Sequence, residues 1–185
     1  MKREEKKQLN RRRMIEAAVH LFSVKPFEDV SMRDIARHAD VSPALIYKYF
    51  DDQQHLYIEA MKGEAQKLIQ RLESNYELDE LVDQYIRFMF TDDVLYQMMA
   101  YFMLEGGGRP RVFPTLREIS QLMSLFEQAL LPLFPTDSKR EAQLLFATLN
   151  GLLITYKNYP SLTNDQTLNL ILSLSERYIT NLQPK

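Results

Sequence analysis

The sequence contains no cysteine among its 185 residues. This absence excludes disulfides, cysteine-based zinc sites and thiol nucleophiles, and it fits the reducing cytoplasm where we expect the protein to act. The longest uninterrupted apolar run, Met98–Leu104, is far too short to span a membrane, so we expect no membrane contact. The charged N-terminus has no apolar stretch of the kind found in signal peptides, and we expect none.

The sequence also lacks the motifs of common catalytic sites. Its three histidines, His20, His38 and His55, have no clustered carboxylates at metal-ligand spacing. No nucleophile elbow or dinucleotide fingerprint occurs, and the glycine run 106–108 neither follows a strand nor precedes a phosphate-binding Lys-Ser/Thr pair. We therefore expect no enzyme activity, no cofactor and no metal site.

The pattern that is present is helical. Apolar residues recur every three or four positions in successive segments. No segment shows a clear strand-like alternation of apolar and polar residues. This predicts an all-α chain of about nine helices in one or two small domains. Residues 1–50 hold eleven Lys and Arg against seven Asp and Glu, while residues 51–185 hold twelve against eighteen. The basic first part is therefore suited to phosphates.

Residues 31–50 are predicted to form two short helices joined by a tight turn. Ser31 is a favourable N-cap, and Asp34 occupies the capping-box position three residues later. Asp40 lies where the chain must turn, and Asp tolerates the left-handed backbone conformation better than most residues. Four apolar residues at helical spacing predict the buried stripe of the first helix: Met32, Ile35, Ala36 and Ala39.

The second helix of this stretch begins at Ser42 as N-cap with Pro43 at its first position. Ile46 and Phe50 lie on one side of it. The other side, which is free to be exposed, carries Pro43, Ala44, Tyr47 and Lys48. This outer face is typical of a recognition helix in a DNA major groove. On spacing alone, a corner in an ordinary helical domain explains the pattern equally well.

The segment Ile15–Leu56 resembles the DNA-binding domain of the TetR family of transcriptional regulators. The matching residues are Ile15, Ala17, Ala18, Leu21, Phe22, Phe27, Ser31, Ile35, Ala36, Ala39, Val41, Ser42, Ile46, Tyr47, Tyr49, Phe50 and Leu56. The sequence departs from the family pattern at Asp40 and Ala44, where Gly is common. It also has Gln53 where the family often has a phosphate-contacting Lys.

The resemblance implies a helix-turn-helix domain at residues 1–53 and a helical effector-binding and dimerisation domain at residues 54–185. It also implies a bacterial repressor that binds a palindromic double-stranded DNA operator as a homodimer. We expect Tyr47, Lys48 and Tyr49 to hold phosphates and Arg33 to reach guanine, with apolar contacts to thymine. The expected DNA-binding residues are Ser31, Arg33, Ser42, Pro43, Ala44, Leu45, Tyr47, Lys48 and Tyr49.

Seven basic residues precede the first apolar stripe: Lys2, Arg3, Lys6, Lys7, Arg11, Arg12 and Arg13. They could contact flanking phosphates or the minor groove, or they could form a solvated helix start.

The last two long helices are apolar around more than one stripe, so a second face needs a partner. A row of small residues at four-residue spacing would let another helix approach closely. We expect a four-helix dimer interface, although a central core helix in a monomer is the alternative. The expected interface residues are Ala147, Gly151, Thr155, Ile171, Leu174 and Tyr178.

Methionine and phenylalanine are concentrated in the middle helices, and methionine recurs at adaptable apolar binding surfaces. We expect a pocket for a small apolar or amphipathic effector, with plain core packing as the alternative. The candidate pocket residues are Phe88, Met89, Met98, Met99, Phe102, Met103, Met123 and Phe126. Two alternatives remain. The protein is a regulator controlled by a protein partner or without any small-molecule effector, or it is a helical interaction module that does not bind DNA.

Overall fold

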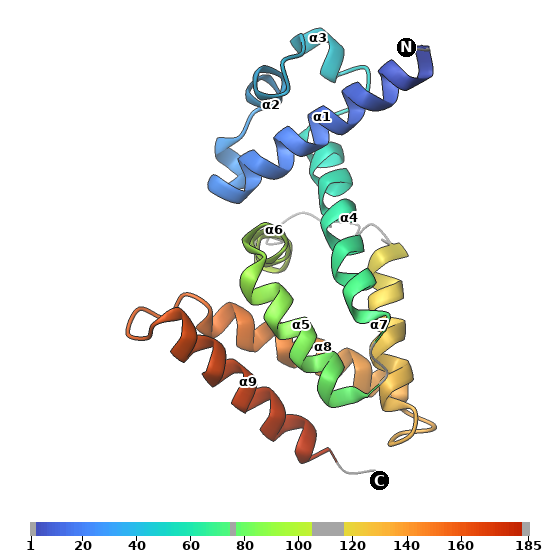
Figure 1. The fold of residues 1–185 in the computed structure, drawn as a ribbon, viewed down its shortest axis with the longest axis vertical. Helices are drawn as coiled ribbons and strands as arrows, with labels where there is room; N and C mark the ends of the chain where they lie inside the picture. The colour runs from blue at the N-terminus through green and yellow to red at the C-terminus, as the bar shows by residue number, and fades with distance from the viewer. Residues whose placement is uncertain (1–2, 75–76, 105–116, 183–185) are drawn as a thin grey trace. The chain divides into compact units, whose positions relative to one another are not determined.

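The computed structural model describes residues 3–74, 77–104 and 117–182, and all regular structure in these ranges is helical. The elements are α1 (Arg3–Val24), the 3-10 helix η1 (Phe27–Asp29), α2 (Met32–His38), α3 (Pro43–Ile46), α4 (Gln53–Leu72), α5 (Leu78–Thr91), α6 (Asp93–Leu104), α7 (Arg117–Leu130), α8 (Ser138–Tyr156) and α9 (Asn164–Thr180). The prediction of an all-α chain is confirmed (Figure 1). No helix in these ranges is both long and apolar enough to cross a membrane.

The chain folds into two compact units. The first unit is Met1–Glu64 with Asp93–Pro110, which includes α1 to α3, the start of α4, and α6. The second is Ala65–Asp92 with Arg111–Lys185, which includes the end of α4, α5 and α7 to α9. The expected domain boundary after residue 53 falls at the start of α4. By packing, the units divide inside α4, and α6 joins the N-terminal helices.

An aromatic cluster at the core of the first unit explains why α6 belongs there. Phe22 of α1 and Phe27 of η1 both meet the ring of Tyr57 edge-on, at centroid distances of 4.8 and 5.0 Å. Tyr101 of α6 lies 4.9 Å from Phe27, and the Tyr57 hydroxyl donates to the carbonyl oxygen of Met98 at 2.9 Å. Aromatic pairs of this kind add stability beyond the area they bury.

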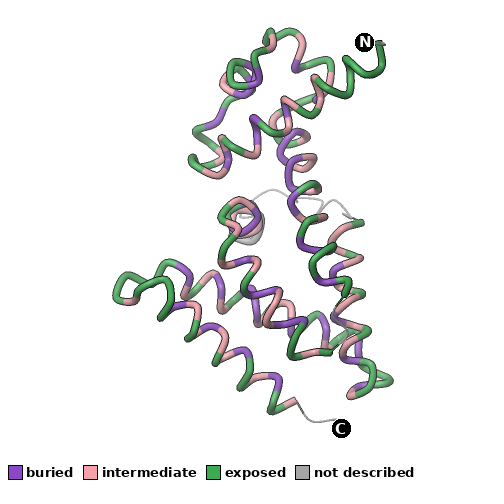
Figure 2. The backbone as a smooth tube through the Cα atoms, viewed as in Figure 1, coloured by how far each residue is buried: buried purple, intermediate pink, exposed green. Residues whose placement is uncertain are grey.

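The second unit is built around α5, which packs against α7, α8 and α9. Buried positions recur every three or four residues along α5 and α8 (Figure 2). Tyr85 is fully buried beside Phe126 and Phe146, and its hydroxyl donates to Asn150 Oδ1 at 2.6 Å. Burial raises the pKa of Tyr85 far above its usual value, so this phenol remains a neutral donor.

Candidate nucleic-acid interface

Helix α2 starts with the predicted capping box. The amide of Asp34 donates to Ser31 Oγ at 3.1 Å, while the amide of Ser31 donates to Asp34 Oδ2 at 3.1 Å. Hydrogen bonds from the Ser31 side chain and amide lower the pKa of the Asp34 carboxyl, and the charge of Arg37 lowers it further. The Ser31 hydroxyl, an expected DNA-binding group, is thus already engaged in fixing the start of α2, although the residue is exposed.

The turn between α2 and α3 depends on Asp40. Its φ angle is 55°, in the left-handed region, which confirms the role predicted for this residue. The amide of Val41 donates to the carbonyl of Ala36 at 2.9 Å and closes the end of α2. This turn redirects the chain so that α3 can pack against α2.

Helix α3 is shorter than the predicted helix, because its α-helical part ends at Ile46 and residues 47–49 form a turn. Its start is as predicted, since Ser42 Oγ accepts from the amide of Leu45 at 3.2 Å and Pro43 occupies the first position. Ile46 and Phe50 are buried at 0% and 1% exposure. Because Ile46 and Phe50 face the core, the residues on the opposite side of the segment face solvent.

We call the exposed residues among those expected to bind DNA, from Arg33 onward, the recognition face. It consists of exposed side chains from α2, α3 and the following turn: Arg33, Ser42, Pro43, Ala44, Tyr47 and Lys48. Leu45 and Tyr49, also expected to bind DNA, are half-buried. Tyr47 is 54% exposed and is therefore accessible to a partner.

The cations near the recognition face differ in how far they are neutralised. Arg33 and Lys48 form no ion pair with any residue in the described ranges. Arg37 pairs with Asp34, and Arg13 pairs with Asp40 at 3.3 Å. Arg33 and Lys48 are therefore the cations of this surface that are free to meet phosphate or guanine.

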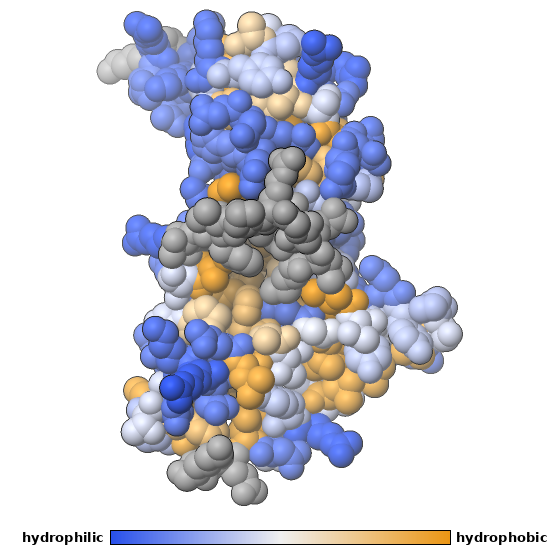
Figure 3. Space-filling view, turned by 180° about the vertical axis from the view of Figure 1, so that it is seen from behind, coloured by the Kyte–Doolittle hydropathy of each residue, from blue (hydrophilic) through white to orange (hydrophobic). Residues whose placement is uncertain are grey.

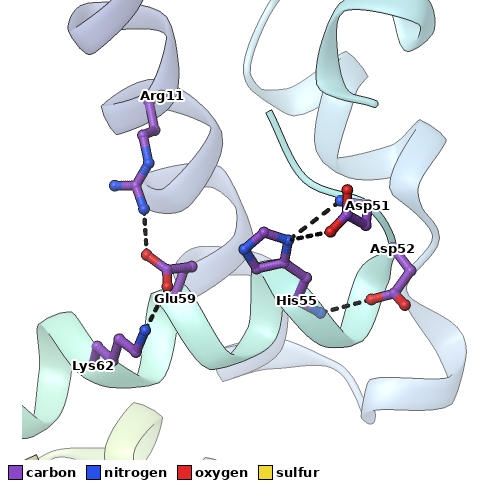
Figure 4. A network of polar contacts seen from close by, with 6 residues as sticks. All are labelled: Arg11, Asp51, Asp52, His55, Glu59 and Lys62. Carbon is purple, nitrogen blue, oxygen red and sulfur yellow. Dashed lines mark hydrogen bonds and ion pairs between the residues drawn. The ribbon is translucent and has the colours of Figure 1, made fainter. Parts of the chain in front are cut away.

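Arg11 has a structural role that the sequence did not predict (Figure 4). Its guanidinium pairs with Glu59 of α4 and lies 5.7 Å from the ring centre of Phe50. Lys62 also pairs with Glu59, at 2.6 Å. Burial raises the pKa of the Glu59 carboxyl, but Lys62 and Arg11 outweigh this effect and hold that pKa below its usual value. Arg11 therefore links α1 to α4, and its positive charge is paired with the Glu59 carboxylate.

Gln53, at the position where the resemblance suggested a phosphate-contacting Lys, has its side chain engaged within the first unit. Its Nε2 donates to the carbonyl oxygen of Phe27 at 2.7 Å, which ties η1 to the start of α4. At the same end of α4, the amide of His55 donates to Asp52 Oδ1 at 2.7 Å (Figure 4). The start of α4 is thus held by internal contacts.

The expected effector-pocket residues are divided between the units. Met98 and Met99 of α6 belong to the first unit, whereas the second holds Phe88, Met89, Met123 and Phe126. Met89 and Phe126 are buried at 1% and 0% exposure, and the Met89 carbonyl accepts from the buried Lys157 Nζ at 3.0 Å. The side chains of Phe102 and Met103 lie outside the described residues.

The expected dimer residues on α8 are exposed. Ala147, Gly151 and Thr155 follow one another at four-residue spacing, with Leu144 beside them at 53% exposure. A Cβ atom at Gly151 would meet no other atom within 4 Å, so nothing within the described chain requires glycine there.

On α9, Leu174 and Tyr178 are half-buried, and the Tyr178 hydroxyl is buried without a hydrogen-bond partner in the described ranges. Ile171 is fully buried within the unit, so it lies in the core rather than on this surface. We call Leu144, Ala147, Gly151, Thr155, Leu174 and Tyr178 the α8–α9 face. Figure 3 shows hydrophobic patches interspersed with hydrophilic ones on the side of the molecule that it displays.

A capped pair of short helices with an exposed outer face and a buried inner face has the geometry of a helix-turn-helix motif. The sequence profile of bacterial regulatory proteins of the tetR family matches residues 14–60 of this chain. Residues 14–60 span the helix-turn-helix segment with its flanking helices, so the match supports a DNA-binding domain of this kind.

The relatives that the chain resembles include a transcriptional repressor. The transcriptional repressor KstR of Rhodococcus jostii is 26% identical over 138 residues, which cover 70% of this chain and 63% of KstR. The chain thus matches less than two thirds of the length of that relative.

Two solved structures share the fold. The fatty acid degradation regulator FadR from Bacillus halodurans has a TM-score of 0.72 at 16% identity, covering 92% of this chain and 98% of FadR. FadR from Bacillus subtilis in complex with stearoyl-CoA has a TM-score of 0.68 at 18% identity, covering 88% of this chain and 96% of that one. At such identities the likeness concerns the fold alone.

Proposed function

We propose that this chain is a sequence-specific DNA-binding transcriptional regulator that acts as a repressor in the bacterial cytoplasm. The observation that carries the proposal is the recognition face, whose exposed side chains include Tyr47 and the two cations Arg33 and Lys48, neither of which pairs with a described residue. A surface of this kind can hold phosphates with Tyr and Lys while Arg reads a base edge. Ala44 and Leu45 offer apolar contact to thymine methyl groups.

Binding to DNA from the region flanking the gene tests this proposal. Tyr47→Ala should weaken binding to operator and random DNA alike, because phosphate contacts carry little sequence information. The control is Tyr159→Ala, which removes a comparably exposed tyrosine (47%) from the second unit. DNA affinity that does not fall with rising salt, or an equal loss in both variants, would contradict the proposal.

The proposed regulator acts as a homodimer on a palindromic operator. The α8–α9 face supports this, since small and apolar residues remain exposed on it in a single chain. The exposed row Ala147, Gly151, Thr155 would let a helix of a second copy approach closely, and a two-fold pairing would present two recognition faces. Sedimentation of the purified protein tests the oligomeric state.

A small apolar or amphipathic effector is proposed to control DNA binding from the second unit. The B. subtilis FadR complex holds stearoyl-CoA in a similar fold, and Met89 and Phe126 lie in the core of the second unit. An effector can act only through a difference in affinity for the two states of the regulator. A rise in melting temperature with acyl compounds of increasing chain length would support this effector. If no such compound shifts the melting temperature, control by a protein partner or by no small effector is favoured.

A further inference from the structure

A groove runs between α5 and α9 of the second unit, and its volume is about 340 Å³. These two helices pack side by side (Figure 1). Three of the residues that line the groove are apolar and are here called its floor: Val82 from α5 and Leu172 and Ile179 from α9, with Ser175 of α9 also lining the groove. Its volume lies at the lower end of the range of small-molecule sites on proteins.

The rim of the groove carries charge of one sign. Asp79, Glu80 and Asp83 line it from α5, Glu176 lines it from α9, and no Lys, Arg or His is among the lining residues. The groove is therefore complementary to a cation that also has an apolar body.

Two of these four carboxylates already have partners. Asp83 pairs with Arg87 at 2.8 Å, and Glu80 accepts a hydrogen bond from Gln84 at 3.0 Å. Asp79 and Glu176 are exposed and make no ion pair or hydrogen bond with any described residue. These two acids, on opposite walls of the groove, are available to a bound cation.

We propose that this groove binds a small amphipathic organic cation, with its ammonium group between Asp79 and Glu176 and its apolar body on Leu172 and Ile179. The site is distinct from the apolar core around Phe126, and its occupation does not require DNA binding.

The groove remains open in the proposed dimer. Residues two positions apart on an α-helix point about 200° apart. Leu172 and Glu176, which line the groove, therefore point away from Leu174, which belongs to the α8–α9 face. A second copy seated on the α8–α9 face would leave the groove accessible.

Three probes with one apolar body and different charges test the proposal on the full-length protein: 4-phenylbutylamine, 4-phenylbutanol and 4-phenylbutyrate. Amide chemical shifts followed by NMR report both weak affinity and location. The amine is expected to bind about fivefold more tightly than the alcohol, because each exposed charge pair contributes modestly. The butyrate should bind most weakly, and shifts should concentrate at residues 79–83 and 172–179.

Substitutions then separate charge from shape. Asp79→Asn and Glu176→Gln should each weaken amine binding about two- to fivefold, and the double variant should bind amine and alcohol alike. Glu73→Gln, which removes an exposed carboxylate outside the groove, is the control and should change nothing. Leu172→Ala should weaken amine and alcohol equally, because it removes part of the shared floor.

Several outcomes overturn the proposal. These are equal affinity for amine and alcohol, shifts centred elsewhere, and an amine affinity unaffected by the double variant. A pentalysine peptide that binds as tightly as the amine and gives the same shifts would instead identify a general acidic surface. Loss of operator binding alone would count against the proposed function and leave this site intact.

Discussion

The recognition face and the α8–α9 face are both exposed, yet they are built in different ways. The first is polar, and its neighbouring caps and turn explain why each backbone segment lies where it does. The second carries small and apolar residues, and Gly151 has no reason within the described chain to be glycine. The packing of this chain alone explains the first surface, whereas the second is the one for which we propose a second copy as partner.

The largest expected effect is on association through the α8–α9 face. Gly151→Leu should weaken the dimer by about a hundredfold or more, or about 2.7 kcal/mol, as measured by sedimentation. The same change should raise the helix stability of the separate chain by about 1 kcal/mol, because glycine is unfavourable inside a helix and the site is open.

Gly63 provides the matched control for this prediction. It is also an exposed helical glycine, and a Cβ atom there would meet no atom within 4 Å. Gly63→Leu should leave association unchanged. A Gly151→Leu protein that still forms the dimer would remove the distinction between the two faces.

The next largest effect concerns sequence preference at the recognition face. Arg33→Ala should reduce discrimination between operator and random DNA by about 1–3 kcal/mol, because Arg to guanine is a strong base contact. Arg37→Ala should have a smaller effect, since this arginine of the same helix already pairs with Asp34. Competition binding measures both, and the reverse order would reassign the base-reading role to Arg37.

The recognition face was predictable because its signals are local. Ser31, Ser42 and Asp40 each act within four residues of their own position, and the structure places all three in the predicted roles. The end of α3 was predicted less well. Ile46 and Phe50 lie on the buried side in either conformation, so their spacing does not determine whether residues 47–49 form a helix or a turn.

Contacts between residues far apart in the sequence could not be predicted from the spacing of residue types. Arg11 meets Glu59 across 48 positions and Gln53 meets Phe27 across 26, so neither pairing leaves a periodic trace. Likewise, the apolar stripe of α6 indicates which side is buried but not what covers it. Its place beside Tyr57 therefore emerged only from the structure.

At acid pH, we expect the free energy of unfolding to fall because of two carboxylates in the first unit. Asp34 and Glu59 both have lowered pKa values there, so their stabilisation is present above the unfolded values of 3.8 and 4.5 and is lost as pH falls through the folded values. Glu59→Gln should cost about 1 kcal/mol near neutral pH and much less once the pH is below the lowered pKa of Glu59.

Urea unfolding at a series of pH values measures this effect. Glu16→Gln serves as the control, because Glu16 makes no ion pair with a described residue. Equal costs for Glu59→Gln at neutral and acid pH would show that packing rather than charge links α1 to α4.

The smallest expected effect tests how far the turn before the recognition face depends on backbone conformation. Asp40 has a φ of 55°, a region that costs an ordinary residue about 1 kcal/mol or more. Asp40→Ala should therefore lower the free energy of unfolding by about 1 kcal/mol. Asp40→Gly should change the free energy of unfolding by only a few tenths of a kcal/mol, because relief of the backbone cost offsets loss of the exposed ion pair with Arg13.

Asp40→Asn is the control. It keeps a side chain that tolerates the left-handed region but removes the charge, so it measures the ion pair alone. If Asn and Ala proved equally destabilising in urea unfolding, the Arg13 contact and not the left-handed turn would be what holds α2 and α3 in place.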